Sequence, residues 1–188
     1  MFENIRADII RVHHCTKKLG PIDVLHSFWI NYGLRALMVY RLGRWLTSIR
    51  KHRCGWIVTA LFYPIYWLLS ICINKAYGID LDQSANIAPG LYINHLGGIE
   101  VRNCSIGPRC NIQQLVKLGS TKTTDGGLVI GEEVWIGAHA QICTDVSVGD
   151  GATIGAGAVV TQDVPHHCLV LGNPGRIVQR NYDNREFL

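Results

Sequence analysis

One histidine in the sequence has a carboxylate upstream at a spacing that allows acid–base catalysis. The histidine is His95 and the carboxylate is that of Asp80. An imidazole held by a carboxylate can take a proton from a hydroxyl group while the hydroxyl oxygen attacks a thioester carbonyl. The carboxylate fixes the tautomer of the imidazole and stabilises the imidazolium. The alternative is that His95 is an ordinary surface histidine in a turn. The secondary-structure elements that carry the two residues decide between these two interpretations.

From residue 79 onward the sequence repeats every six residues. Aliphatic residues occupy the repeating position at Leu81, Ile87, Ile93, Ile99, Ile106, Ile112, Leu118, Ile130, Ile136, Ile142, Val148, Ile154 and Val160. A small or aliphatic residue usually follows four positions later. This period fits a short strand and a tight turn, three times per coil, which gives a triangular prism with coils of about 18 residues. We expect the aliphatic side chains to point to the axis of the prism.

Two departures from the period interrupt the prism. One extra residue separates Ile99 from Ile106, so we place a break at residues 100–105. One repeat near residue 124 lacks its aliphatic residue, within a segment rich in turn-forming residues. We therefore expect a protruding loop at 119–128, and loops on rigid scaffolds usually serve binding.

The repeat also places the candidate catalytic residues. His95 lies two residues beyond the axial Ile93, so we expect its ring to face outward. The stretch from Asp80 to His95 is slightly shorter than one coil, which puts the two residues on adjacent coils near one edge. A contact between the two side chains is therefore expected.

Two short motifs inside the repeat resemble a known family. Residues 134–138 (VWIGA) and 172–177 (GNPGRI) are similar to hexapeptide-repeat acyltransferases, and the chain resembles serine acetyltransferase and its relatives in surface-polysaccharide biosynthesis over about residues 77–178. The resemblance implies a left-handed parallel β-helix, a homotrimer and acetyl-CoA as the donor. It also implies that His95 is the general base and that Asp80 orients it, because the family has a histidine with an aspartate at the same spacing upstream.

The resemblance implies that acetyl-CoA lies in the groove between neighbouring prisms. The residues that it assigns to the donor are Ser120, Trp135, Ala138, Ala156, Thr161, Gln162 and Arg176. A lysine is common in the family where this chain has Gln162. Simple packing between coils explains the alanine positions equally well, so that alternative stays open.

The acceptor site departs from the family pattern. Asn94 stands where serine acetyltransferases have an aspartate, and Thr123–Gly127 lacks their Arg-His pair. A zwitterionic amino acid needs charged partners. We therefore expect the acceptor to be a hydroxyl of a sugar in surface-polysaccharide or lipid-linked glycan biosynthesis, with Asn94 bound to it. Serine O-acetylation and a non-catalytic scaffold are the alternatives.

Residues 1–76 form a basic, aromatic arm, for which we predict α-helices. This segment carries 11 Lys and Arg against 3 Asp and Glu, whereas residues 77–188 carry 7 against 11. Residues 21–50 have apolar residues at helical spacing, and residues 54–74 carry no charge. A transmembrane span is disfavoured because it would export the catalytic domain. Two alternatives remain: a helical pair that packs on protein, including a dimer of trimers through the arm, or peripheral contact with the inner face of the membrane.

The other residue patterns exclude several classes of function. His139 lies in a regular repeat, and the adjacent pairs His13-His14 and His166-His167 rarely converge on one metal ion, so we expect no metal. No P-loop, G-x-S-x-G or H-E-x-x-H motif occurs. The arginines of the arm come without a recognition module, so no nucleic-acid partner is expected.

The cysteines and the N-terminus indicate the compartment. Seven dispersed cysteines without a C-x-x-C motif are typical of reduced thiols in the cytoplasm. The first 20 residues lack the apolar run of a signal peptide. We therefore predict a cytoplasmic protein that is mainly β: an arm at 1–76, a β-helical catalytic domain at 77–178 and a tail at 179–188.

Overall fold

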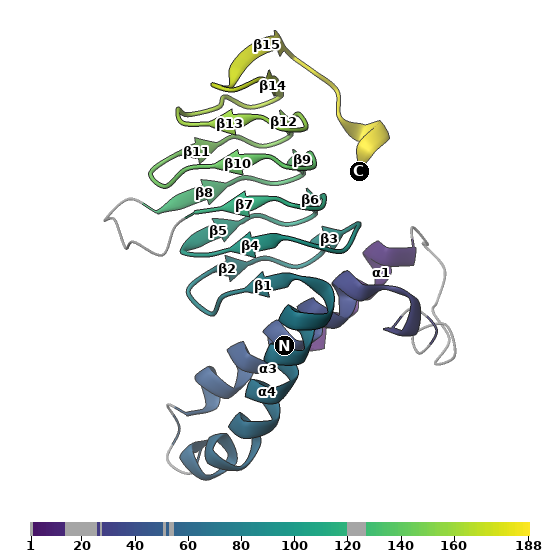
Figure 1. Cartoon of the computed structure of the whole chain (residues 1–188), viewed down its shortest axis with the longest axis vertical. Helices are drawn as coiled ribbons and strands as arrows, with labels where there is room; N and C mark the ends of the chain where they lie inside the picture. The colour runs from purple at the N-terminus through teal and green to yellow at the C-terminus, as the bar shows by residue number, and fades with distance from the viewer. Residues whose placement is uncertain (1, 14–25, 27, 51, 53–54, 120–126) are drawn as a thin grey trace.

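A computed structural model describes residues 2–13, 26, 28–50, 52, 55–119 and 127–188 of the chain. In these residues an arm of helices stands at one end of a prism of short strands (Figure 1). The helices are α1 (Phe2–His13), α3 (Tyr32–Ile49) and α4 (Gly55–Tyr77). The predicted fold class, mainly β with an N-terminal α-helical arm, is confirmed.

The strands are two to five residues long, as a period of six residues requires. They are β1 (Ile79–Leu81), β2 (Asn86–Ile87), β3 (Tyr92–Ile93), β4 (Ile99–Val101), β5 (Cys104–Ile106), β6 (Asn111–Ile112), β7 (Lys117–Leu118), β8 (Leu128–Ile130), β9 (Trp135–Ile136), β10 (Gln141–Ile142), β11 (Ser147–Val148), β12 (Thr153–Ile154), β13 (Val159–Val160), β14 (Cys168–Leu171) and β15 (Arg176–Arg180). A 3-10 turn at Arg185–Phe187 follows.

Successive strands belong to three different sheets, which form the three faces of the prism. The strand orders are β1-β4-β7-β10-β13, β2-β5-β8-β11 and β3-β6-β9-β12-β14-β15, and we name these sheets A, B and C. Pairing is parallel except between β14 and β15. In the upper coils Ile136 lies beside Ile154 and Ile142 beside Val160, so one coil takes three repeats of the sequence, as predicted.

The axis of the prism is filled with aliphatic side chains, as the repeat predicts. Ile112, Ile136 and Ile154 are fully buried, and the corner residues Ala140 and Ala158 are buried beside them. Burial of each large aliphatic side chain contributes about 1.5–3 kcal/mol. This column of apolar contacts makes the prism a rigid scaffold for the side chains at its edges.

The arm is tied to the first coil through a buried ion pair. The Arg41 guanidinium on α3 donates to the Asp8 carboxylate on α1, with Nε to Oδ2 at 3.2 Å. Arg41 also donates to the carbonyl oxygen of Ala88 at 2.8 Å, and Asp8 accepts from the backbone N–H of Gly90 at 2.7 Å. Two helices and the base of the prism therefore meet at one charged pair.

The helix predicted over residues 21–50 is interrupted. Residues 26 and 28–30 are helical, but Asn31 is extended, with φ −96° and ψ 109°, and α3 begins at Tyr32. The Asn31 side chain accepts a hydrogen bond from the backbone N–H of Leu34 at 2.9 Å, which is an N-cap. The predicted start near Pro21 lies outside the described residues.

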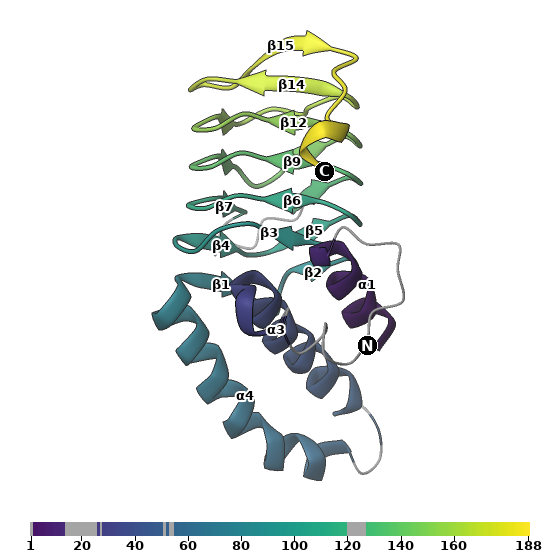
Figure 2. The same cartoon turned by 90° about the vertical axis from the view of Figure 1, so that its right-hand side faces the viewer.

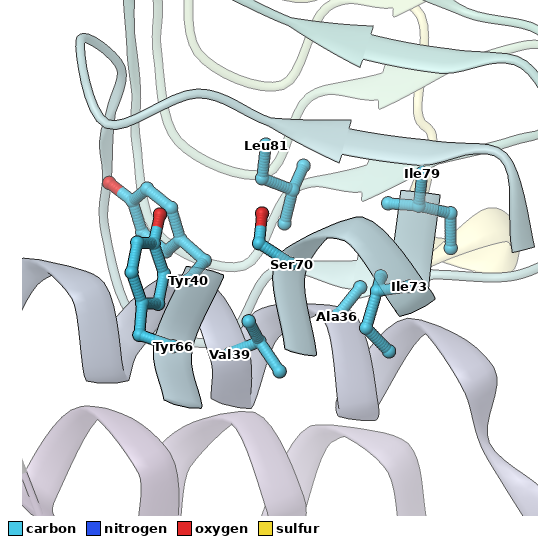
Figure 3. A pocket seen from close by; sticks show the side chains of 8 residues that line it. All are labelled: Ala36, Val39, Tyr40, Tyr66, Ser70, Ile73, Ile79 and Leu81. Atoms are coloured by element: carbon cyan, nitrogen blue, oxygen red, sulfur yellow. The ribbon is translucent and has the colours of Figure 1, made fainter. Parts of the chain in front are cut away.

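Helix α4 rests on α3 and the first strand along one narrow stripe. Figure 3 shows Tyr66 beside Tyr40 of α3, Ser70 directed toward Leu81 of β1, and Ile73 beside Ala36 of α3. The gap between these elements is about 10 Å³, which leaves room for one water molecule at most. It is a packing seam that is too small for a ligand.

Candidate active site

His95 lies in a turn that is longer than the standard turn of the repeat. Val101, not Ile99, is in register with Leu81 and Leu118. Val101 therefore lies eight positions after the axial Ile93, where a standard repeat has a spacing of six. The predicted break at 100–105 is thus wrong in position: the two added residues are in the turn at 94–98, and the turn at 102–103 is one residue short.

The His95 turn is held against the start of β1. The N–H of Gly97 donates to the carbonyl oxygen of Tyr77 at 2.8 Å, and the N–H of Ile99 donates to that of Gly78 at 2.9 Å. A Cβ at Gly78 would lie 2.9 Å from the nitrogen of Gly98, so the two backbones need glycine there. His95 itself is exposed, as expected.

Asp80 lies on sheet A, two residues beyond this contact. Its register partner is Glu100. Its carboxylate pairs with the Arg102 guanidinium, and the side chains of Arg102 and Asp80 are 32% and 28% exposed. The backbone therefore brings Asp80 and the His95 turn to one edge. Among the described residues no hydrogen bond joins the two side chains, so the expected contact between them stays a prediction.

One edge of the prism collects three of the predicted site residues. At this edge, between sheets C and A, successive turns are joined by three backbone hydrogen bonds: Leu115 N–H to Gly97 O, His139 N–H to Gln114 O, and Gly157 N–H to Ala138 O, at 2.8–3.0 Å. His95, Ala138 and Ala156 therefore lie along one line that runs up the prism. Ala156 is exposed and Ala138 half-buried, so the line is accessible.

The other predicted donor residues lie elsewhere on the prism. Thr161 and Gln162 follow β13 at the next edge, between sheets A and B, and Arg176 begins β15. Gln162 and Arg176 line one cavity of about 190 Å³. Ser120 lies outside the described residues, as does most of the predicted loop at 119–128.

Asn94 and Trp135 line an open groove of about 460 Å³ on sheet C. The Asn94 amide donates to Gln113 Oε1 at 3.1 Å and accepts from the Tyr92 hydroxyl at 3.3 Å. The Trp135 ring lies 5.3 Å from the ring of Phe187 in the C-terminal tail, which packs over this sheet (Figure 2). Trp135 is thus predicted for the donor but contacts the tail in this structure.

This arrangement suits proton transfer at an exposed edge. An exposed histidine lies in a turn that is hydrogen-bonded to the start of β1, the strand of Asp80, and an arginine holds the Asp80 carboxylate. Among the described residues, no group of three or more His, Cys, Asp or Glu side chains is arranged to hold a metal ion. Sequence reasoning missed Arg102, since its proximity to Asp80 depends on the register of the first coil.

Comparison with known sequences identifies the repeat and its relatives. Residues 127–162 match the family described as bacterial transferase hexapeptide (six repeats). The chain is 37% identical over 149 residues to a serine acetyltransferase of Salmonella typhimurium, covering 78% of this chain and 50% of that protein. It is 31% identical over 152 residues to one of Synechococcus elongatus, covering 79% and 58%. The chain thus spans about half the length of these relatives.

Solved structures of serine acetyltransferases have the same architecture. One, described as a complex with CoA, is 30% identical with a TM-score of 0.73, covering 94% of this chain and 68% of that chain. The enzyme from Brucella abortus strain S19 is 26% identical with a TM-score of 0.75, covering 95% and 69%. The likeness extends over the arm as well as the prism.

These comparisons overturn the predicted sugar acceptor. The relatives at 31–37% identity and the solved structures are serine acetyltransferases. The prediction relied on charges missing at Asn94 and in residues 123–127. The chain belongs to the family of bacterial hexapeptide-repeat transferases, and its similarity within that family is to serine acetyltransferases.

Proposed function

We propose that this chain is an acetyl-CoA-dependent O-acetyltransferase whose acceptor is the hydroxyl group of serine. The observation that carries the proposal is the His95 turn, docked on β1 beside Asp80, in a chain 37% identical to a serine acetyltransferase. The names of the relatives support serine as the substrate, and the exposed position of His95 at an edge of the prism supports its assignment as the base.

The proposed reaction is direct transfer. One imidazole nitrogen of His95 takes the proton of the serine hydroxyl as its oxygen attacks the thioester carbonyl carbon. The tetrahedral intermediate then collapses, the carbon–sulfur bond breaks, and the CoA thiolate takes the proton from the imidazolium. Asp80 orients the imidazole and stabilises its charged form. Asn94, at the same turn, donates a hydrogen bond to the acceptor.

The proposed donor site follows the edge above His95. A pantetheine chain has amide groups that pair with backbone N–H and C=O groups, and small residues let it approach the backbone closely. Ala138 and Ala156 are accessible along this edge. We assign Ser120, Trp135, Thr161, Gln162 and Arg176 to the rest of acetyl-CoA, with Arg176 as the cation for its phosphates.

A second prism completes this site in the proposal. One edge alone gives an open surface, and a groove forms when the edge faces a neighbouring copy, as in a homotrimer. We place the enzyme in the cytoplasm because acetyl-CoA is a cytoplasmic substrate and the described cysteines are free thiols.

Release of the CoA thiol tests the proposal. The full chain, acetyl-CoA and L-serine should release the thiol and form O-acetylserine. L-alanine is the matched control because it lacks only the hydroxyl group, and it should give background release. Release no faster with L-serine than with L-alanine, from a folded trimer that binds acetyl-CoA, would contradict serine as the acceptor.

A further inference from the structure

The outer side of α4 is an exposed apolar surface that the proposed active site does not use. Of its 23 residues only Gly55 is buried, and its mean hydropathy over the most apolar window is 1.8. The large apolar side chains that it exposes are Trp56, Ile57, Leu61, Phe62, Tyr63, Ile65, Trp67, Leu68 and Leu69. Contiguous apolar surface of this extent marks an interaction site in a soluble protein.

The inner side of α4 is already occupied. Tyr66, Ser70 and Ile73 pack on α3 and β1, and the Thr59 hydroxyl donates to the carbonyl oxygen of Leu46 at 3.3 Å. These residues form one stripe at helical spacing, so the rest of the circumference faces away from the protein. Because the stripe holds the helix against α3, α4 cannot cross a bilayer alone without detaching from α3.

Basic residues stand at both ends of this apolar face. Arg50 is exposed just before the helix, and Lys75 is exposed in its last turn. Residues 24–79 contain no Asp or Glu at all. A second copy of the arm would bring cations against cations, which costs free energy. Anionic lipid headgroups supply the missing counter-charge, at about 1 kcal/mol for each Lys or Arg near the surface.

The aromatic side chains fit the same partner. Trp56, Tyr63 and Trp67 are more than half exposed on α4, at 64%, 53% and 57%, and Trp29 is 68% exposed on the arm. Tryptophan and tyrosine favour the boundary between headgroups and acyl chains. We propose that the outer side of α4 docks the protein in the plane of an anionic phospholipid membrane surface, with the prism above it in the cytoplasm.

Flotation with vesicles tests this docking. The full chain should float with vesicles of equal parts phosphatidylcholine and phosphatidylglycerol, and high sodium chloride should release it. It should float poorly with phosphatidylcholine alone. The combined variant Ile57→Gln, Leu61→Gln, Trp67→Gln, Leu68→Gln keeps good helix formers on the outer side and should lower vesicle binding more than about tenfold.

Two further variants separate the contributions. Arg50→Gln and Lys75→Gln should each lower binding to the anionic vesicles about fivefold. Val129→Gln with Val178→Gln removes exposed apolar side chains from the prism instead and should leave vesicle binding unchanged.

Several outcomes would overturn the proposal. One is a full chain that stays unbound with anionic vesicles, and another is equal flotation of the four-glutamine variant. Equal, salt-insensitive binding to neutral vesicles would also contradict it. A mass in light scattering that halves in the four-glutamine variant, with no vesicle binding by either protein, would show that a second copy covers α4.

Discussion

Asp80 and Arg102 form an ion pair across sheet A, although they are far apart in the sequence. Asp80 is on β1, and Arg102 directly follows β4, the neighbouring strand. The Arg102 guanidinium donates to Oδ2 of the carboxylate, so Oδ1 can accept from another donor. The guanidinium therefore fixes the carboxylate that we assign to orient His95.

If Arg102 positions Asp80, its loss should lower the rate and not the affinity for serine. We expect Arg102→Gln to lower kcat about tenfold, because a misplaced supporting group weakens the catalytic geometry. The KM for serine should stay within about twofold. Steady-state kinetics check this, and Arg109→Gln, which breaks an exposed ion pair with Glu133, is the matched control. A higher KM with unchanged kcat would instead make Arg102 a substrate-binding residue.

The Asp8–Arg41 pair should anchor the arm. Asp8→Ala leaves the buried Arg41 guanidinium without its partner, which costs about 3–5 kcal/mol. We expect α1 to become sensitive to limited proteolysis and the urea midpoint to fall. Asp8→Ala with Arg41→Met should recover part of the loss, since no buried charge remains. If the Asp8→Ala variant has the urea midpoint of the native chain, the ion pair contributes nothing to stability.

The axial column should carry most of the stability of the prism. Ile136→Ala removes a fully buried side chain and should lower the free energy of unfolding by about 2–5 kcal/mol. Val129→Ala, at an exposed position on sheet B, should change it by less than about 0.5 kcal/mol. Urea unfolding of the two variants checks this, and similar midpoints would contradict an aliphatic axis.

Burial should protect two thiols from alkylation. Desolvation raises the pKa of Cys104 and of Cys110 to about 12. Since only the thiolate reacts, neither should be labelled in the folded protein up to about pH 9. The exposed Cys72 and Cys143 should react with iodoacetamide under the same conditions. Peptide mapping checks this, and labelling of Cys110 before Cys143 would contradict the packing of the second coil.

The prism was predictable because every coil repeats one requirement, an aliphatic residue at the axis. The register at the His95 turn was not, because Ile99 and Val101 are both fully buried and the sequence pattern does not distinguish them. The backbone pairing of β4 with β1 puts Val101 at the axial position. This register brings Arg102 next to Asp80. The interruption at Asn31 in the helix predicted over residues 21–50 was missed because Asn31 caps the start of α3 through a local hydrogen bond, which apolar spacing does not reveal.

The acceptor could not be predicted from missing charges. Asn94 can hydrogen-bond to an alcohol or to an amino acid, so an asparagine at this position does not distinguish the two acceptors. The relative that matches 78% of this chain at 37% identity is a serine acetyltransferase, and two substituted positions do not outweigh that similarity.

Removal of the His95 imidazole tests the central claim most directly. His95 is exposed and has no hydrogen-bond partner among the described residues, so His95→Ala should fold and assemble like the native chain. Its kcat for CoA release with L-serine should fall about 10²–10⁴-fold, whereas His52→Ala, which removes an exposed imidazole from the arm, should match the native rate. A His95→Ala protein that turns over serine at the native rate would contradict the proposed mechanism.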